Sequence, residues 1–179
     1  MDGVLAPWPE DYDDDDEGDD AYDDDAMAGL EHCDNEVSEE SVAAFSELLS
    51  AIPEEHRKVV FSSAWRLHKT CTQHILDIFC EYGEKHGGPL KDLKLFDSRT
   101  GEHHESRQIE IARWVMEHAK DGIAAWVALD DRGSILKEPR YLHLFKGHAV
   151  VTEKHVGLTS DDVKDALDLV KHQLLGELA

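Results

Sequence analysis

The sequence of 179 residues lacks long apolar runs and has few cysteines and few basic residues. A membrane-spanning helix needs about 20 predominantly apolar residues in a row, and the sequence predicts no such span. Three irregularly spaced cysteines are too few for a disulfide framework and match no zinc-binding pattern. The 40 acidic residues outnumber the 18 basic ones, which excludes the basic surface that usually tracks nucleic-acid phosphates.

The start of the sequence shows no signal peptide, because Met1 is followed at once by Asp2 and Gly3. Together with the low cysteine content, this start favours a reducing, intracellular compartment, cytoplasmic or nuclear. Twelve histidines raise the question of a metal site. Neither the set His68, Cys71 and His74 nor the pair His103–His104 has the spacing of a zinc site, so we expect surface or half-buried histidines.

Much of the negative charge lies in one segment. Between Glu10 and Asp25, 12 of 16 residues are acidic. Like charges at this density repel, and little apolar surface is present to offset the entropy of ordering. We therefore expect residues 10–36 to form a disordered acidic insertion and residues 37–179 to form the folded domain. Without the 12 acidic residues, 28 acidic and 18 basic residues leave a formal charge of −10, which is ordinary for a soluble domain.

After the acidic segment, helical apolar spacing alternates with short strand-like runs. Ser38 is a candidate N-cap of a first helix that ends before Pro53, and Thr159 and Asp162 form a capping-box-like pair. We predict helices over about 42–52, 72–82, 106–118 and from 159 onward, and strands over 58–61, 124–129 and 150–152. Strands that alternate with helices in this way predict βαβ units and a parallel sheet.

Polar residues stand at three expected strand ends, namely Asp2-Gly3, Ser62-Ser63 and Asp130-Asp131. Ligands of open parallel sheets bind beyond the carboxyl ends of the strands. We therefore expect these residues to gather at one functional edge.

Five segments carry a family resemblance, in family order and over nearly the whole chain apart from the acidic segment. They are Asp2–Leu5, Val60–Arg66, Ser106–Ile111, Trp126–Asp131 and Gly157–Thr159. The ordered set resembles the haloacid-dehalogenase-like (HAD) phosphatase superfamily, in particular the HAD domain of Swiss-army-knife RNA repair proteins. The resemblance implies an α/β fold with a three-layer, doubly wound parallel sheet. Its first strand is largely missing here, and no cap domain is evident.

The family's first motif, Asp-x-Asp-Gly-Val-Leu, matches the chain from Met1 onward. The resemblance implies that Asp2 is the motif's second Asp, a general acid/base and metal ligand, and that residues 1–9 are the remnant of this motif. The first Asp, the nucleophile, would stand one position before Met1. A truncated gene model and a degenerate homologue both explain this pattern, and the intact later motifs favour truncation.

The second motif ends a hydrophobic strand with a Ser or Thr that binds a phosphoryl oxygen. The resemblance assigns this role to Ser62, with Ser63 beside it and Arg66 as a further contact to substrate. A hydroxyl at the carboxyl end of a strand can reach a phosphate in the crevice there. The alternatives are that Ser63 caps the following helix and that Arg66 forms a surface ion pair.

The third motif supplies a cation that stabilises the phosphorylated intermediate. Arg107 matches it, since a guanidinium suits phosphate and carboxylate geometry. Lys94 is a second candidate, in a loop region that fits less well. The alternative for Arg107 is a helix-surface ion pair with Glu110, three residues further on.

The fourth motif is the pair Asp130 and Asp131, directly after an apolar run. Hard oxygen ligands at a strand end suit Mg²⁺, which also bridges to phosphoryl oxygens. The resemblance thus implies a Mg²⁺ site formed by Asp2, Asp130 and Asp131. An ordinary Asp-Asp-Arg-Gly turn is the competing interpretation.

Two functions of different classes remain open. The first is a Mg²⁺-dependent phosphatase that acts through an aspartyl-phosphate on a phosphorylated substrate such as a nucleic-acid end or a nucleotide, and that is inactive as written because the nucleophile is absent. The second is a catalytically dead binding module whose acidic segment docks a basic protein. For that segment, a solvated linker without a partner is the simpler interpretation.

Overall fold

A computed structural model of the chain describes residues 4–7, 36–67, 69–97, 106–131, 135 and 139–176. Asp2 lies outside the described residues, as does the expected acidic insertion apart from Glu36. Among the described residues, no helix is both long and apolar enough to cross a membrane.

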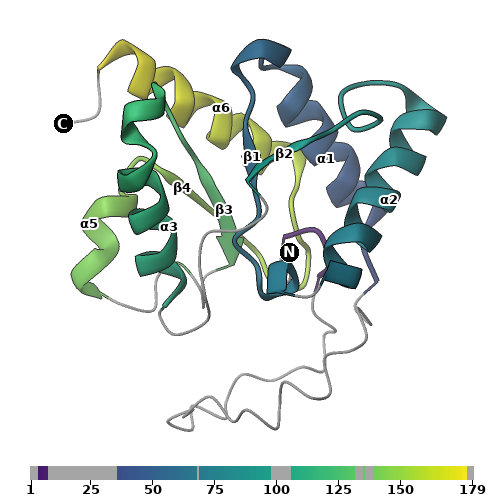
Figure 1. Ribbon diagram of the computed structural model, residues 1–179, viewed down its shortest axis with the longest axis horizontal. Helices are drawn as coiled ribbons and strands as arrows, with labels where there is room; N and C mark the ends of the chain where they lie inside the picture. The colour runs from purple at the N-terminus through teal and green to yellow at the C-terminus, as the bar shows by residue number, and fades with distance from the viewer. Residues whose placement is uncertain are drawn as a thin grey trace, which may run out of the picture.

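Helices and short parallel strands alternate along the described chain (Figure 1). The helices are α1 (Glu39–Ser50), α2 (Lys69–His86), α3 (Arg107–Glu117), α5 (Leu142–Phe145) and α6 (Ser160–Leu175). The strands are β1 (Val59–Val60), β2 (Leu95–Asp97), β3 (Ala128–Asp131) and β4 (Ala149–Thr152). Short 3₁₀ helices are η2 (Glu54–His56), η3 (Ala64–Leu67), η4 (Ala119–Asp121) and η5 (Pro139–Tyr141).

The two predicted helix caps are confirmed. The Ser38 side chain accepts a hydrogen bond from the backbone N–H of Ser41 at the start of α1. At the start of α6, Thr159 and Asp162 form the complete capping box. Each cap satisfies backbone donors that a helix N-terminus otherwise leaves unpaired.

The predicted strand at 124–129 is wrong at its start, because β3 begins at Ala128 and extends through Asp131. The backbone N–H and C=O of Trp126 bond instead to the side-chain amide of Gln173 in α6. The same amide also donates to the carbonyl of Gly147. The Gln173 side chain therefore fixes the segments that precede β3 and β4.

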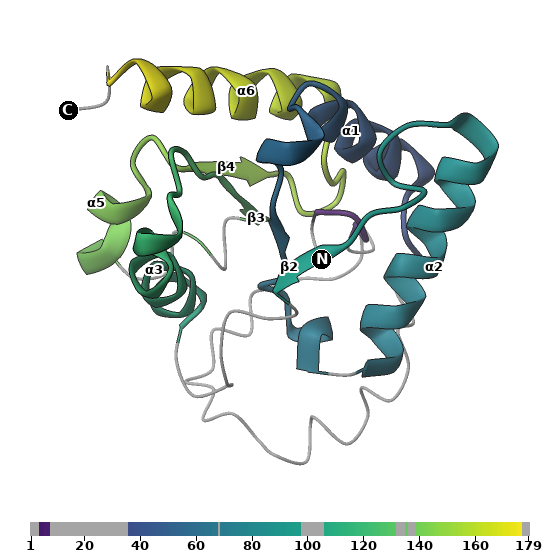
Figure 2. The same cartoon turned by 45° about the horizontal axis from the view of Figure 1, so that its top comes forward.

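The strands form two parallel pairs, β1 with β2 and β3 with β4. Helices α3 and α5 lie on one side of β3 and β4, and α6 runs along the other side (Figure 2). Helices α1 and α2 flank β1 and β2 on the side away from α3 (Figure 1). Short parallel strands between helices are consistent with the expected α/β class, whereas the three-layer, doubly wound arrangement stays a prediction.

The larger hydrophobic core surrounds the short segment Val4–Ala6, which is almost fully buried. The carbonyl of Leu5 accepts a hydrogen bond of 2.8 Å from the N–H of Ser38, and the carbonyl of Val4 accepts one of 2.7 Å from that of Leu158. These bonds tie the segment to the starts of α1 and α6. A smaller core joins α3, β3 and α5 through Ile111, Ala128, Ile135 and Phe145.

Cys71 is disulfide-bonded. A disulfide bond is not what we expect of a protein in a reducing compartment. Cys80 in the same helix is a free, half-buried thiol, so the bond does not join these two residues. The spacing of three cysteines carries no information on a single bond of this kind.

Candidate functional site

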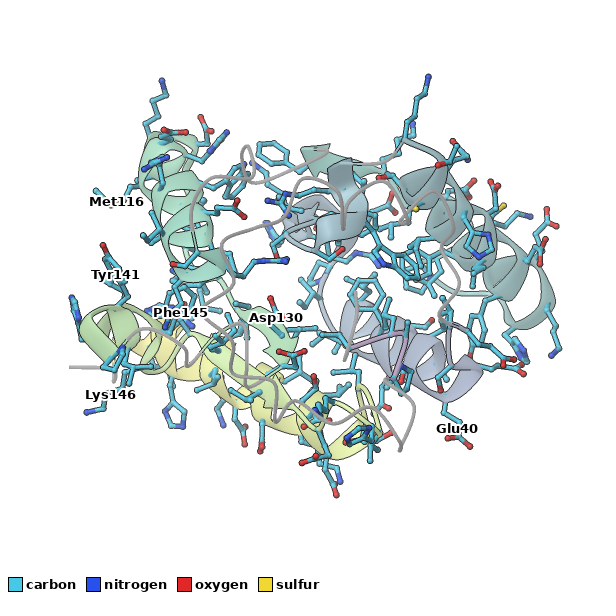
Figure 3. The ribbon with its side chains drawn as sticks, turned by 90° about the horizontal axis from the view of Figure 1, so that it is seen from below. Glu40, Met116, Asp130, Tyr141, Phe145 and Lys146 are labelled. Carbon is cyan, nitrogen blue, oxygen red and sulfur yellow. The ribbon has the colours of Figure 1, made fainter. Side chains whose placement is uncertain are left out.

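The pair Asp130 and Asp131 forms the last two residues of β3. Side chains alternate along a strand, and Ala128, on the same face as Asp130, packs against Ile111 of α3. Asp130 is accordingly buried, at 5% exposure, on the side of α3, whereas Asp131 is half-buried. Figure 3 shows Asp130 near the middle of the molecule, between α3 and α5 on one side and α1 and α2 on the other.

The first residue of α3, Arg107, supplies a cation close to this carboxylate. Arg107 Nη1 lies 3.9 Å from Asp130 Oδ2, which is an ion pair without a close hydrogen bond. Nη1 is buried and has no hydrogen-bond partner within the described part of the chain. Desolvation by burial raises the pKa of Asp130, and the positive charge of Arg107 opposes this rise. A buried donor and a buried carboxyl with a raised pKa are thus adjacent, as in many functional sites.

The segment after β1 holds the predicted hydroxyls. Ser62 is half-buried, and Ser63 is buried at 5% exposure. The Oγ of Ser63 has no hydrogen-bond partner among the residues that the structure describes. A buried hydroxyl without a protein partner is uncommon and suits contact with a ligand oxygen.

Arg66 lies inside the protein rather than at its surface. Its side chain is 1% exposed, and its Nη1 donates to the carbonyls of Ser62 and Ser63 at 2.7 Å each. Its Nη2 lies 2.5 Å from Glu110 Oε2 in α3. The surface ion pair considered for Arg66 is therefore wrong, because the pair is buried and links two distant segments. Glu110 pairs with Arg66 rather than on the helix surface with Arg107.

Lys94 does not join these residues. It is exposed and precedes β2, and Leu95 pairs with Val59 at the start of β1. Lys94 is therefore at the amino end of this strand pair, opposite to the end from which Ser62 follows. Of the two candidate cations, Arg107 is the one beside the carboxyl end of a strand, β3.

Two buried polar residues near the site were not predicted. Thr152 is 2% exposed and pairs with Asp131 across β3 and β4, so both lie at the same edge. Gln108 is fully buried and donates from its amide to the carbonyl of Ile135. A Thr at the end of an expected strand was a usable signal, since strand ends in a parallel sheet meet at one edge. Nothing in the local sequence predicts the contact of Gln108 with Ile135.

The donor set fits a hard cation such as Mg²⁺ in part. Within the described ranges, no cluster of three potential metal ligands occurs. Asp130 and Asp131 provide two carboxylates, and Mg²⁺ is commonly held by one or two carboxylates together with water and substrate phosphate. The raised pKa of the buried Asp130 fits as well, because a nearby cation would stabilise the charged form. Asp2, the third expected ligand, is outside the described residues.

Most of the chain matches one known protein family. The family model of the HAD domain in Swiss Army Knife RNA repair proteins matches residues 1–163, which is most of the chain. The chain belongs to this family. Membership supports a phosphatase type of function and a phosphorylated substrate, because the HAD class includes phosphatases. Searches among curated proteins and among solved structures yielded no significant match.

Proposed function

We propose that the protein is a Mg²⁺-dependent phosphatase of the HAD class, with the three-layer, doubly wound sheet of that class. The observation that carries the proposal is the pair of buried groups at the end of β3. Within the described part of the chain, Arg107 Nη1 has no hydrogen-bond partner and lies 3.9 Å from the carboxyl group of Asp130. The Arg107 guanidinium favours a bound anion, and the buried Asp130 carboxylate favours a bound cation.

We assign each site residue a separate role in binding and transferring a phosphoryl group. The Ser62 hydroxyl donates to a phosphoryl oxygen. The buried Ser63 hydroxyl either stabilises the segment after β1 or donates to a second phosphoryl oxygen. The Arg107 guanidinium neutralises charge on the phosphoryl group and orients it by its N–H groups. Asp2 is proposed as the general acid/base that protonates the leaving alkoxide and later deprotonates water.

Asp130 and Asp131, with Asp2, would hold the Mg²⁺ ion. When bound, the cation supplies charge neutralisation at the phosphoryl oxygens. Burial of Asp130 keeps water from screening that charge, and Arg107 holds Asp130 from the side of α3. Thr152, paired with Asp131, keeps the ends of β3 and β4 in register.

The nucleophile of the family is the first Asp of the first motif. We propose that turnover requires this Asp, and that the residues from Met1 onward, tested on their own, bind phosphate with at most trace turnover. Covalent catalysis requires a carboxylate that displaces the alcohol and forms an aspartyl-phosphate, which water then hydrolyses to phosphate.

We propose a nucleic-acid end or a nucleotide as the substrate. Membership in an RNA repair family supports this class. The formal charge of −22 disfavours contacts along a nucleic-acid backbone, so a terminal phosphate is the better fit. The alternative is a binding module that has lost catalysis, with the acidic segment as the docking element for a basic protein.

Turnover by an extended chain tests the proposal. A strand of about six apolar residues followed by Asp is placed before Met1, with an Asn version as the control. Hydrolysis of an aryl phosphate and of a 3′-phosphorylated oligonucleotide is followed with and without Mg²⁺. We expect Mg²⁺-dependent turnover that the Asn version lowers by roughly several orders of magnitude. A folded extended chain that hydrolyses no phosphoester would favour the binding module.

A further inference from the structure

The guanidinium of Arg66 connects parts of the protein that are far apart in sequence. One terminal nitrogen bonds the carbonyls of Ser62 and Ser63, and the other contacts the carboxylate of Glu110, 44 residues away. Both side chains of the ion pair are almost fully buried, at 1% and 4% exposure. The Arg66 guanidinium therefore joins the segment after β1 to the first turn of α3.

The same turn of α3 also carries Arg107, which faces Asp130 at the end of β3. Contacts thus link Ser62 through Arg66 to Glu110, and the same helical turn places Arg107 beside Asp130. In the described part of the protein, β1–β2 and β3–β4 are separate strand pairs without a shared ladder. The ion pair is one of the links that set the distance between the two strand ends.

We propose that the Arg66–Glu110 pair positions the phosphate-binding groups of the two strand pairs relative to one another. The inference rests on the proposed function, and it makes Arg66 a positioning residue rather than a group that touches substrate. It explains why the carbonyls of both Ser62 and Ser63 bond one nitrogen, since that contact fixes the loop that presents their hydroxyls.

The chemistry of the pair favours positioning over simple stabilisation. A buried ion pair adds little net stability, because the desolvation of two charges offsets their attraction, and apolar residues of similar size often replace it without loss. A planar guanidinium does what an apolar pair cannot do, because it holds two carbonyls and one carboxylate in fixed directions. The two roles therefore predict different results when the pair is replaced by apolar residues.

The decisive variant is the double substitution Arg66→Met/Glu110→Leu, which removes both charges of this ion pair together. The matched control is Lys85→Met/Glu39→Leu, which removes an ion pair of 2.8 Å that is exposed and lies between α1 and α2. Binding of orthophosphate to the full chain is measured by calorimetry in the presence of Mg²⁺, and the melting temperature is measured for each variant.

We expect the double variant to stay folded, with a melting temperature within a few degrees of that of the wild type, and to bind orthophosphate at least about tenfold more weakly. We expect the control to bind as the wild type does. If the double variant does not fold, Arg66→Lys tests the positioning role instead. Lys keeps the charge but cannot hold both carbonyls and Glu110. This variant too should lose about tenfold in affinity.

Unchanged phosphate affinity in a folded variant, beside a wild type that binds phosphate, would overturn the positioning role alone. A wild type that binds no orthophosphate would overturn both this inference and the proposed function. The two failures are distinguishable because the second is visible without any variant.

Discussion

Burial of single polar side chains determines the chemistry available at the end of β3. Asp130 has lost nearly all contact with water, and Arg107 lies too far away to form a close hydrogen bond with it. The desolvation of the carboxylate therefore prevails over the attraction, and the pKa of Asp130 is raised. A protein gains no stability from such a group at neutral pH, which fits a residue kept for binding.

Replacement of Asp130 by Asn tests this assignment through the pH dependence of stability. Since the folded pKa lies above the ordinary value of about 3.9, stability from the protonated carboxyl is fully present below that ordinary value and is lost as the pH rises through the folded pKa. Asp130→Asn should therefore match the wild type near pH 4 and exceed its melting temperature at pH 7 to 8, without Mg²⁺.

The control is Asp161→Asn, at an exposed carboxylate whose hydrogen bond and attraction to Lys164 lower its pKa. Its effect has the opposite sign, because stability from that pair is present above the unfolded pKa and is lost in acid. An Asp130→Asn variant that is less stable than the wild type at pH 8, and equal to it at pH 4, would contradict the burial argument.

The individual site residues could be predicted to the extent that each has a local signal. Ser62, Arg107 and Asp130 follow apolar runs or begin a helix, and the order of the motifs identified them. The partner of Arg66 could not be predicted, because Glu110 is 44 residues distant and only the packing of α3 beside the segment after β1 brings the two together. Thr152 needed the strand register for the same reason.

The element that joins β4 to α6 shows how a single turn holds the core segment in place. Gly157 has a φ of +79°, a left-handed conformation that L residues rarely adopt. A Cβ at this position would lie 2.6 Å from Ser41 Oγ and 2.8 Å from the carbonyl oxygen of Val4. The turn therefore needs glycine for its backbone conformation and for the close approach of α1 and the Val4 segment.

Gly157→Ala should destabilise the protein more than Gly122→Ala does. Gly122 has a similar φ of +77°, with no atom of the described residues within 4 Å of an added Cβ, so its substitution isolates the backbone strain at about 1–2 kcal/mol. Gly157→Ala adds two steric clashes, and we expect at least about twice that loss in the free energy of unfolding, measured with urea. Equal losses for both variants would show that the turn relaxes around the new methyl group.

Elements with a clear apolar pattern could be predicted from sequence, including the short strands β1 and β4, whereas β2 and α5 could not. Helices α1, α3 and α6 have apolar stripes, and α1 and α6 also have the expected N-caps at Ser38 and Thr159. Strand β2 and helix α5 have three and four residues, which is too short for a period to be recognised. Strand β3 is shorter at its start than its apolar run suggests, because Gln173 takes the backbone bonds of Trp126.

Across the whole molecule, charge is distributed unevenly, and the acidic segment carries 12 of the 40 acidic residues. We expect deletion of residues 10–25 to leave the melting temperature within about 2 °C, because the segment offers little apolar surface for packing. Thermal unfolding of the full and shortened chains, compared at one salt concentration, checks this. A much lower melting temperature of the shortened chain would show that the segment packs on the domain.

The overall class of the fold could be predicted, whereas the three-layer arrangement stays a prediction. Alternating helices and buried strands indicated parallel β-structure, and two parallel pairs with helices on either side of β3 and β4 are present (Figure 2). Strand order depends on pairing between distant segments, which local periodicity does not encode.

The central claim is that Ser62, Arg107 and Asp130 serve one phosphoryl site built on two strand pairs. Calorimetric titration of orthophosphate in Mg²⁺ into the wild type, Ser62→Ala and Arg107→Ala tests this claim most directly. The account predicts binding to the wild type and a loss of at least about tenfold in affinity for each variant, with the larger loss for Arg107→Ala. Equal affinity in all three folded proteins would contradict it.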